Sequence, residues 1–163
     1  MRTRRRSAVV LLALAAFLLL AASASAAGTL TYDGDTLVFT TSDNLNHDVQ
    51  FRLSDDGNND EIIDIQTIAS APGDCFYVVD PTWVSCPGHA GVRADFGAGN
   101  DSVTTARDCF TSYTFNLGDG ANDNDFNSAC PDTATATVNS GSGDDTLRGG
   151  SAGTSTTLNA GGG

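Results

Sequence analysis

Residues 138–145 read Val-Asn-Ser-Gly-Ser-Gly-Asp-Asp, and this stretch decides the fold because the chain repeats it. Earlier copies are Ala-Asp-Phe-Gly-Ala-Gly-Asn-Asp at 94–101 and Phe-Asn-Leu-Gly-Asp-Gly-Ala-Asn at 115–122. A fourth copy begins at 158–163 with Leu-Asn-Ala-Gly-Gly-Gly. The aligned glycines are 21, 23 and 20 residues apart, at Gly97, Gly118, Gly141 and Gly161. A period of this length is typical of solenoids, in which each unit buries its apolar face only against its neighbours.

The composition around the repeats predicts an all-β protein. Nineteen of the 20 acidic residues are Asp, Glu61 is the one Glu, and the chain has no Lys. Asp and Gly favour turns, and the abundant Thr and Val favour strands. We expect N-terminal strands near 29–32, 36–39, 49–53 and 62–68, the last with Ile63 and Ile65 on its buried face. These hairpins lead into a short parallel β-roll or β-solenoid.

Three segments follow from this pattern. Residues 1–27 combine four arginines, an apolar run at 11–20 and small residues at 24–27, the order of a secretory signal peptide rather than a membrane anchor. Residues 28–91 form an N-terminal β cap, and residues 92–163 form the repeats, which we expect to be truncated at the C-terminus. Beyond the signal, four arginines oppose 20 acids, a net charge of −16. Such a charge excludes nucleic acid and anionic membrane as partners, although acidic surfaces also suit high salt.

The repeats resemble a known family. Gly97-x-Gly99-Asn100-Asp101-x-Val103 and Gly141-x-Gly143-Asp144-Asp145-x-Leu147 are similar to the nonapeptide of hemolysin-type (repeats-in-toxin, RTX) calcium-binding proteins of bacteria. In that family, glycines let carbonyls turn toward the cation and the sixth-position Asp supplies a carboxylate. Ca²⁺ takes six to eight oxygen ligands, so several stacked turns must contribute together.

The resemblance implies a set of calcium ligands. Asp101 and Asp145 would be the sixth-position carboxylates, with carbonyls from the glycines before them. The middle copy departs from the pattern, because Asn122 replaces the Asp and Asn124 occupies the apolar eighth position. Asp123 or Asp125 would then have to be recruited. The candidate metal residues are Gly97, Gly99, Asn100, Asp101, Gly118, Gly120, Asn122, Asp123, Gly141, Gly143, Asp144 and Asp145.

Four cysteines in a secreted chain predict two disulfides. Three connectivities are open, and the local one, Cys75–Cys86 with Cys109–Cys130, is the most economical. Between Cys75 and Cys86, two β-type runs flank Asp80-Pro81, so a hairpin would bring these cysteines opposite each other.

Other candidate sites have weaker patterns. Asp56, Asn58 and Asp60 have the opening spacing of an EF-hand loop, but the glycine and the twelfth-position Glu of that loop are missing, which favours a solvated turn. His47 and His89 lack metal-ligand spacing and are expected to be ordinary loop histidines. Gly149-x-Ser151-x-Gly153 matches a nucleophile elbow but no His follows it. We therefore expect no enzyme activity.

The sequence thus predicts a secreted, extracellular calcium-binding protein whose repeats are ordered by Ca²⁺. Two alternatives remain open. One is a structural or adhesive cell-surface solenoid, and the other is a fragment of a longer secreted enzyme or toxin. An extracellular or cell-surface partner is compatible with all three, and membrane insertion after signal removal is not expected.

Overall fold

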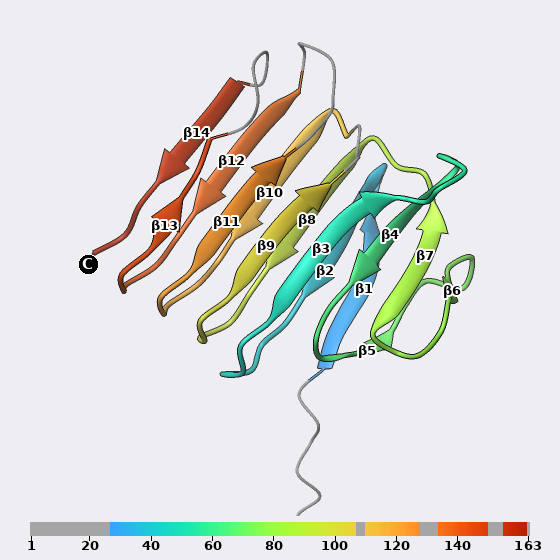
Figure 1. Ribbon diagram of the computed structural model, residues 1–163, viewed down its shortest axis with the longest axis horizontal. Helices are drawn as coiled ribbons and strands as arrows, with labels where there is room; N and C mark the ends of the chain where they lie inside the picture. The colour runs from blue at the N-terminus through green and yellow to red at the C-terminus, as the bar shows by residue number, and fades with distance from the viewer. Residues whose placement is uncertain (1–26, 107–109, 128–133, 150–154, 163) are drawn as a thin grey trace, which may run out of the picture.

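The computed structural model describes residues 27–106, 110–127, 134–149 and 155–162, and these form an all-β structure (Figure 1). No helix occurs in these ranges, and therefore none long and apolar enough to cross a membrane. The described strands are β1 (Ala27–Asp33), β2 (Thr36–Thr40), β3 (Asp48–Leu53), β4 (Asn59–Ile63), β5 (Thr67–Ser70), β6 (Phe76–Tyr77), β7 (Trp83–Pro87), β8 (Gly91–Asp95), β9 (Ser102–Ala106), β10 (Ser112–Asn116), β11 (Asp123–Asn127), β12 (Thr135–Asn139), β13 (Thr146–Leu147) and β14 (Ser155–Asn159).

The strands form two mixed sheets. Sheet A has the order β14-β12-β10-β8-β2-β1-β5, and sheet B has the order β13-β11-β9-β3-β4-β7-β6. From β8 onward the chain alternates between the sheets, so from β10 onward each strand lies beside the strand two places earlier in the sequence. These neighbours pair in parallel, and β2 and β3 join the same parallel rows through β8 and β9. The other end of the molecule is mainly antiparallel, through β1–β2, β3–β4, β4–β7 and β6–β7.

The core lies between the two sheets. In β10, Tyr113 and Phe115 are buried while their neighbours along the strand are partly exposed, as period-two alternation requires. Phe115 stacks on Phe51 of sheet B with ring centroids 5.9 Å apart, and Tyr113 meets Phe126 of sheet B edge to face at 4.5 Å. Aromatic pairs therefore connect the two sheets, and β3, β10 and β11 are held both within their sheets and across the core.

The region expected to be a single strand at 62–68 is two strands, β4 and β5, and this expectation was wrong. Ile65 is 60% exposed, whereas Asp64 is 2% exposed. The inward turn of Asp64 has a polar cause, because its carboxylate accepts hydrogen bonds from the His47 ring and the Asp48 N–H. A buried polar pair has thus overridden the apolar alternation.

The disulfide Cys75–Cys86 is confirmed, and it closes the β6–β7 hairpin. Cys109 and Cys130 lie outside the described residues, so their pairing stays a prediction. The boundary drawn between residues 91 and 92 is not marked by a break in either sheet, because β8 pairs with β2 over its whole length. Of the predicted signal peptide, residues 1–27, only Ala27 lies within the described residues, where it begins β1.

Candidate cation site in the stacked turns

The predicted site residues lie in the turns that carry the chain from sheet A to sheet B. We call each sheet A strand, the following turn and the next sheet B strand a unit. The described units are β2–β3, β8–β9, β10–β11 and β12–β13, with β14 beginning a fifth. Parallel pairing in both sheets puts the four complete turns in register along one edge of the molecule (Figure 1). The structure therefore brings together three turns that are 21 and 23 residues apart in the sequence, and a first turn that lies 54 residues before the second.

Glycines in these turns permit a close approach between backbones. Gly118 and Gly120 have φ values of 69° and 130°, which side chains rarely adopt. A Cβ atom on Gly118 would also meet the carbonyl oxygen of Gly97, and one on Gly120 would meet that of Gly99. Gly141 and Gly143 approach the carbonyls of Gly118 and Gly120 in the same way. The six predicted glycines thus form one stack, in which a larger residue would separate the turns.

The sixth positions form a ladder of side-chain-to-backbone hydrogen bonds. The His47 N–H donates to Asp101 Oδ1 at 2.9 Å, the Asp101 N–H to Asn122 Oδ1 at 2.9 Å, and the Asn122 N–H to Asp145 Oδ1 at 3.0 Å. Each sixth-position side chain therefore accepts a hydrogen bond from one backbone N–H of the preceding unit. One oxygen of each predicted carboxylate has a structural role, and only the second oxygen remains for other chemistry.

In the third unit, the second side-chain atom of the sixth residue is a nitrogen. Asn122 is buried, and its Nδ2 donates to the carbonyl oxygens of Gly118 at 3.1 Å and Gly120 at 3.3 Å. These are the two carbonyls predicted as calcium ligands in this turn. The Asn122 amide therefore gives both carbonyl oxygens a hydrogen-bond donor, so these oxygens need no cation in the third unit.

In the second unit, the corresponding atom is an oxygen. Asp101 is 2% exposed, and its Oδ2 is buried and has no hydrogen-bond partner among the described residues. The register places Asp101 opposite Asn122, so the corresponding carbonyls are those of Gly97 and Gly99. Burial raises the pKa of Asp101, the hydrogen bond and charge of His47 oppose this rise, and the nearby Asp43 and Asp64 add to it. A buried carboxylate oxygen without a hydrogen-bond partner requires a proton or a cation.

The remaining predicted residues are placed differently. Asn100 links turns, because its N–H donates to Asn46 Oδ1 and its own Oδ1 accepts from the Ala121 N–H, both at 2.9 Å. Asp144 is exposed. Asp123 belongs to β11 rather than to the turn, and its Oδ1 lies 3.6 Å from Arg148 Nη1. Neither Asp123 nor Asp144 makes a described contact with the carbonyls of the glycine stack.

Asn124, which breaks the apolar pattern of the eighth position, has a structural explanation. The side chain is fully buried, its Nδ2 donates to the Arg148 carbonyl at 2.8 Å, and its Oδ1 accepts from the Arg148 N–H at 2.9 Å. This amide therefore pairs with the backbone just beyond β13, the short two-residue strand beside β11.

Sequence reasoning missed the part that His47 plays in the turns. The expectation of an ordinary loop histidine was wrong, because the side chain is 1% exposed and both ring nitrogens face carboxylates. Nδ1 lies 2.7 Å from Asp64 Oδ2, and Nε2 lies 3.1 Å from Asp43 Oδ1. Burial lowers the pKa of His47, but the hydrogen bonds and charges of Asp64 and Asp43 outweigh it and raise the pKa overall. No repeat signal marks residues 41–47, because this first turn lacks the glycines.

The EF-hand-like spacing does not produce a ligand set. Asp56 is exposed and accepts hydrogen bonds from the Ser54 hydroxyl and the Asn58 N–H within its own turn. Asp60 is buried and accepts from the backbone N–H of His89 at 2.7 Å, with the His89 ring nitrogen Nδ1 at 3.1 Å. Nowhere in the described residues do three or more His, Cys, Asp or Glu side chains converge as metal ligands. A site in the turns would therefore use carbonyl oxygens beside a single carboxylate.

Comparison with protein-family models, curated proteins and solved structures finds no match for this chain. The functional argument therefore depends on the residues and contacts described above.

Proposed function

We propose that this chain is a secreted calcium-binding protein whose stacked units form a short β-roll similar to that of RTX proteins. The observation that carries the proposal is Asp101 Oδ2, a buried carboxylate oxygen without a hydrogen-bond partner among the described residues. It occupies the register position at which Asn122 bonds two glycine carbonyls. A bound cation would satisfy the carboxylate and the carbonyls together.

The donor chemistry favours a hard cation. The Asp101 carboxylate and the carbonyls of Gly97 and Gly99 would hold calcium in the second unit, and Asp145 with the carbonyls of Gly141 and Gly143 would hold it in the fourth. All of these donors are oxygen atoms, which Ca²⁺ prefers and Zn²⁺ generally does not. In the third unit we assign the same position to the Asn122 amide, so this unit needs no ion.

The experiment that tests the function is calorimetry of the mature protein, residues 28–163, with Ca²⁺ and with Mg²⁺. We expect weak calcium binding with a dissociation constant of about 10⁻⁴–10⁻³ M, as in other extracellular modules. Mg²⁺ should bind more weakly, because it demands octahedral geometry and retains its water. The proposal would be overturned if calorimetry detected no heat of calcium binding at millimolar Ca²⁺, or if Asp101→Asn left calcium binding unchanged.

A second candidate function has its own observation. Along sheet A, Asn116 Nδ2 donates to Asp95 Oδ1 at 2.5 Å, Asn139 Nδ2 to Asn116 Oδ1 at 2.6 Å, and Asn159 Nδ2 to Asn139 Oδ1 at 2.7 Å. This amide ladder stabilises the stack without metal. It favours a structural or adhesive role, in which calcium only adds rigidity. Thermal unfolding that is identical with calcium and with a chelator would favour this second candidate.

Secretion is part of the proposal and is supported by the signal-like sequence of residues 1–27 and by the confirmed disulfide. Whether the chain belongs to a longer enzyme or toxin is a separate question, which the length of the native polypeptide would answer.

A further inference from the structure

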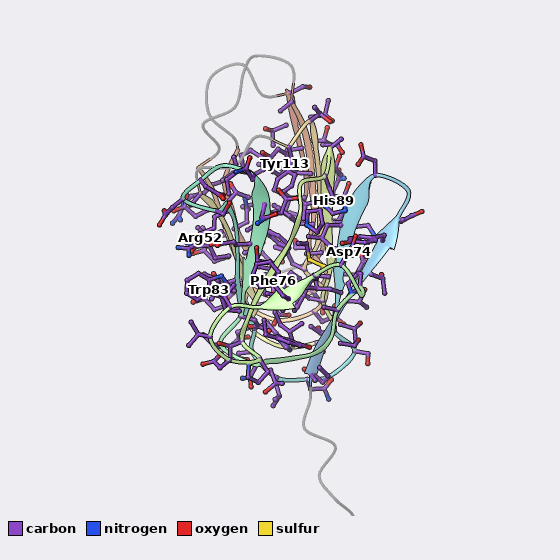
Figure 2. The ribbon with its side chains drawn as sticks, turned by 90° about the vertical axis from the view of Figure 1, so that its right-hand side faces the viewer. Arg52, Asp74, Phe76, Trp83, His89 and Tyr113 are labelled. Atoms are coloured by element: carbon purple, nitrogen blue, oxygen red, sulfur yellow. A yellow bond between two sulfur atoms is a disulfide. The ribbon has the colours of Figure 1, made fainter. Side chains whose placement is uncertain are left out.

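Three strands of sheet A repeat a side-chain pattern that the stacked turns do not use. β10 reads Ser-Tyr-Thr-Phe-Asn, β12 reads Thr-Ala-Thr-Val-Asn, and β14 reads Ser-Thr-Thr-Leu-Asn. Each strand therefore has Ser or Thr first, Thr third and Asn fifth. The second and fourth residues of β10 are buried, and Figure 2 shows Tyr113 between the two sheets. Because side chains alternate along a strand, the repeated residues lie on the outer face of sheet A.

The strand pairing turns this pattern into a two-dimensional array. β12 pairs in parallel with β10 and with β14 over five residues each, without a shift in register. Thr114, Thr137 and Thr157 therefore form one row across the strands, between a row of Ser and Thr and a row of Asn, and every position is partly or fully exposed. Neighbouring strands lie about 4.7–4.9 Å apart, and alternate residues of one strand lie about 6.6 Å apart.

The side chains of the array are ordered by the protein itself. Thr is branched at Cβ, which restricts the rotation of its side chain. Asn139 Nδ2 donates to Asn116 Oδ1 at 2.6 Å, and Asn159 Nδ2 donates to Asn139 Oδ1 at 2.7 Å, so the amides of the fifth positions are held in a ladder. Side-chain ladders of this kind also favour a flat sheet. A ligand would therefore meet a surface that needs little further ordering.

The array is uncharged on a strongly acidic protein. Residues 28–163 carry a net charge of −16, yet no outward position of β10, β12 or β14 is charged. On the neighbouring β8, Arg93 Nε lies 2.9 Å from Asp95 Oδ2, so these two charges pair with each other. The outer face of sheet B differs, because it carries the exposed Asp48 in β3 and Asp125 in β11. The outer face of sheet A therefore suits a neutral occupant.

The regular spacing of the array selects an occupant that is itself a regular lattice. Thr hydroxyls form hydrogen bonds with water, and the methyl groups beside them restrict the orientation of water in the first layer. Charged groups would hold water in shells of a different geometry. The shortest lattice repeat of hexagonal ice is close to the distance between neighbouring strands. No outward position of these three strands is aromatic, so the face lacks a ring on which a sugar could stack.

We propose that the outer face of β10, β12 and β14 binds ice, with the water over the threonine row joining the crystal lattice. The inference goes beyond the proposed calcium binding. It requires only that the units are stacked, and no calcium ion lies at this face. The array spans three strands, so we expect the protein to slow the recrystallisation of ice rather than to prevent freezing.

The test measures how much of the mature protein, residues 28–163, enters a slowly growing ice crystal in millimolar Ca²⁺. We expect the protein to be enriched in the ice relative to the remaining liquid, while an unrelated acidic protein of similar size stays in the liquid. The growth of ice grains in a frozen film held just below its melting point should also slow. Exclusion of the protein from the ice would overturn the inference.

Variants assign the effect to this face. Thr137→Lys places an unpaired charge at the centre of the array and should lower the enrichment in ice by about tenfold. The matched control is Thr104→Lys on the outer face of sheet B, because Thr104 is likewise the partly exposed third residue of its strand. It should leave the enrichment unchanged, and an equal loss in both variants would contradict the assignment. If Thr137→Lys does not fold, Thr157→Lys at an exposed position of the same row decides the question.

Two other occupants are distinguished by further measurements. Binding to insoluble chitin or cellulose without enrichment in ice would overturn the inference and identify a polysaccharide surface. A dimer detected by sedimentation and abolished by Thr137→Lys, again without enrichment in ice, would identify face-to-face pairing of two copies. Calorimetry of Thr137→Lys with Ca²⁺ should match that of the parent protein, which keeps the test of this face separate from the test of calcium binding.

Discussion

At the scale of single residues, the contrast between Asp101 and Asn122 explains how the turns handle charge. In both residues, Oδ1 accepts a hydrogen bond from a backbone N–H at 2.9 Å; the donor is His47 for Asp101 and Asp101 for Asn122. They differ in the second atom, which is an amide nitrogen bonded to two carbonyls in Asn122 and a buried oxygen without a described partner in Asp101. The side-chain hydrogen bonds are therefore complete in the third unit, whereas the Asp101 oxygen of the second unit needs a proton or a cation.

This contrast predicts the effect of Asp101→Asn. The new amide should bond the carbonyls of Gly97 and Gly99, so the calcium-free protein should gain about 1–3 kcal/mol of unfolding free energy. Calcium affinity should fall at the same time, because the site loses its full charge. Chemical denaturation in a chelator and calorimetry with Ca²⁺ measure the two effects. A loss of stability in the calcium-free protein would contradict the argument.

The reverse substitution, Asn122→Asp, should do the opposite. It removes two amide hydrogen bonds and adds a buried charge, so it should destabilise the calcium-free protein by about 1–3 kcal/mol and raise calcium affinity. The control is Asp144→Asn, an exposed position that makes no described contact with the glycine carbonyls. If Asp144→Asn changes calcium affinity as much as Asp101→Asn does, the assignment of ligands is wrong.

His47 predicts a pH dependence. Its pKa is raised in the folded protein, so its contribution to stability is complete below the unfolded value of about 6.5 and is lost as the pH rises through the folded value. Asp43 and Asp64 face its ring, and its backbone N–H contacts Asp101. His47→Gln should therefore cost about 3 kcal/mol at pH 5.5 and less at alkaline pH. Denaturation of both proteins across this pH range, in a chelator, provides the measurement, and a cost that grows with pH would contradict it.

At the scale of elements, the turns can stack because glycine occupies the points of closest approach. Gly120→Ala should destabilise the protein by about 2–4 kcal/mol, since it combines a φ of 130° with a collision against the Gly99 carbonyl. The control is Gly34→Ala, which also has a positive φ, 61°, but nothing within 4 Å of the added Cβ. It should cost only about 1 kcal/mol. If Gly120→Ala and Gly34→Ala lower the thermal unfolding temperature equally, the close contact between neighbouring turns does not contribute to stability.

At the scale of the whole molecule, one end is stapled and antiparallel while the other consists of stacked parallel units. The net charge of −16 over residues 28–163 opposes compaction, and we expect the repulsion to be greatest where aspartates gather in adjacent turns. The disulfide Cys75–Cys86 and the hairpins β4–β7 and β6–β7 stabilise the first end without any ion. Calcium should therefore affect the two ends unequally.

Removal of calcium is expected to increase amide hydrogen exchange in the turns at 96–101 and 140–145 by about tenfold or more, while β4 and β7 stay protected. Exchange measured by mass spectrometry with calcium and with a chelator resolves these segments. Mg²⁺ should restore less protection than Ca²⁺. Uniform change along the chain, or none, would indicate that calcium does not bind in the turns.

The sequence by itself determined the β class and the period of the repeat, and it favoured the Cys75–Cys86 pairing among three possible connectivities. These depend on local signals: strand and turn propensities, glycine spacing, and cysteines that flank one hairpin. It named residues that would meet in the turns, and the glycine stack and the ladder through Asp101, Asn122 and Asp145 are present. Two other named residues are placed differently, because Asp123 belongs to β11 and Asp144 is exposed. Whether these residues bind calcium stays a prediction.

Only the tertiary structure decided that 36–53 belongs to the same parallel rows as the repeats, and that His47 is buried between two carboxylates. It also decided that Asp64, rather than Ile65, turns inward. The physical reason is common to all three. Parallel pairing joins segments separated by 50 residues or more. The buried His47 group is favourable only once folding has brought Asp43 and Asp64, 4 and 17 residues away in the sequence, to its ring. Neither leaves a periodic signal in the local sequence.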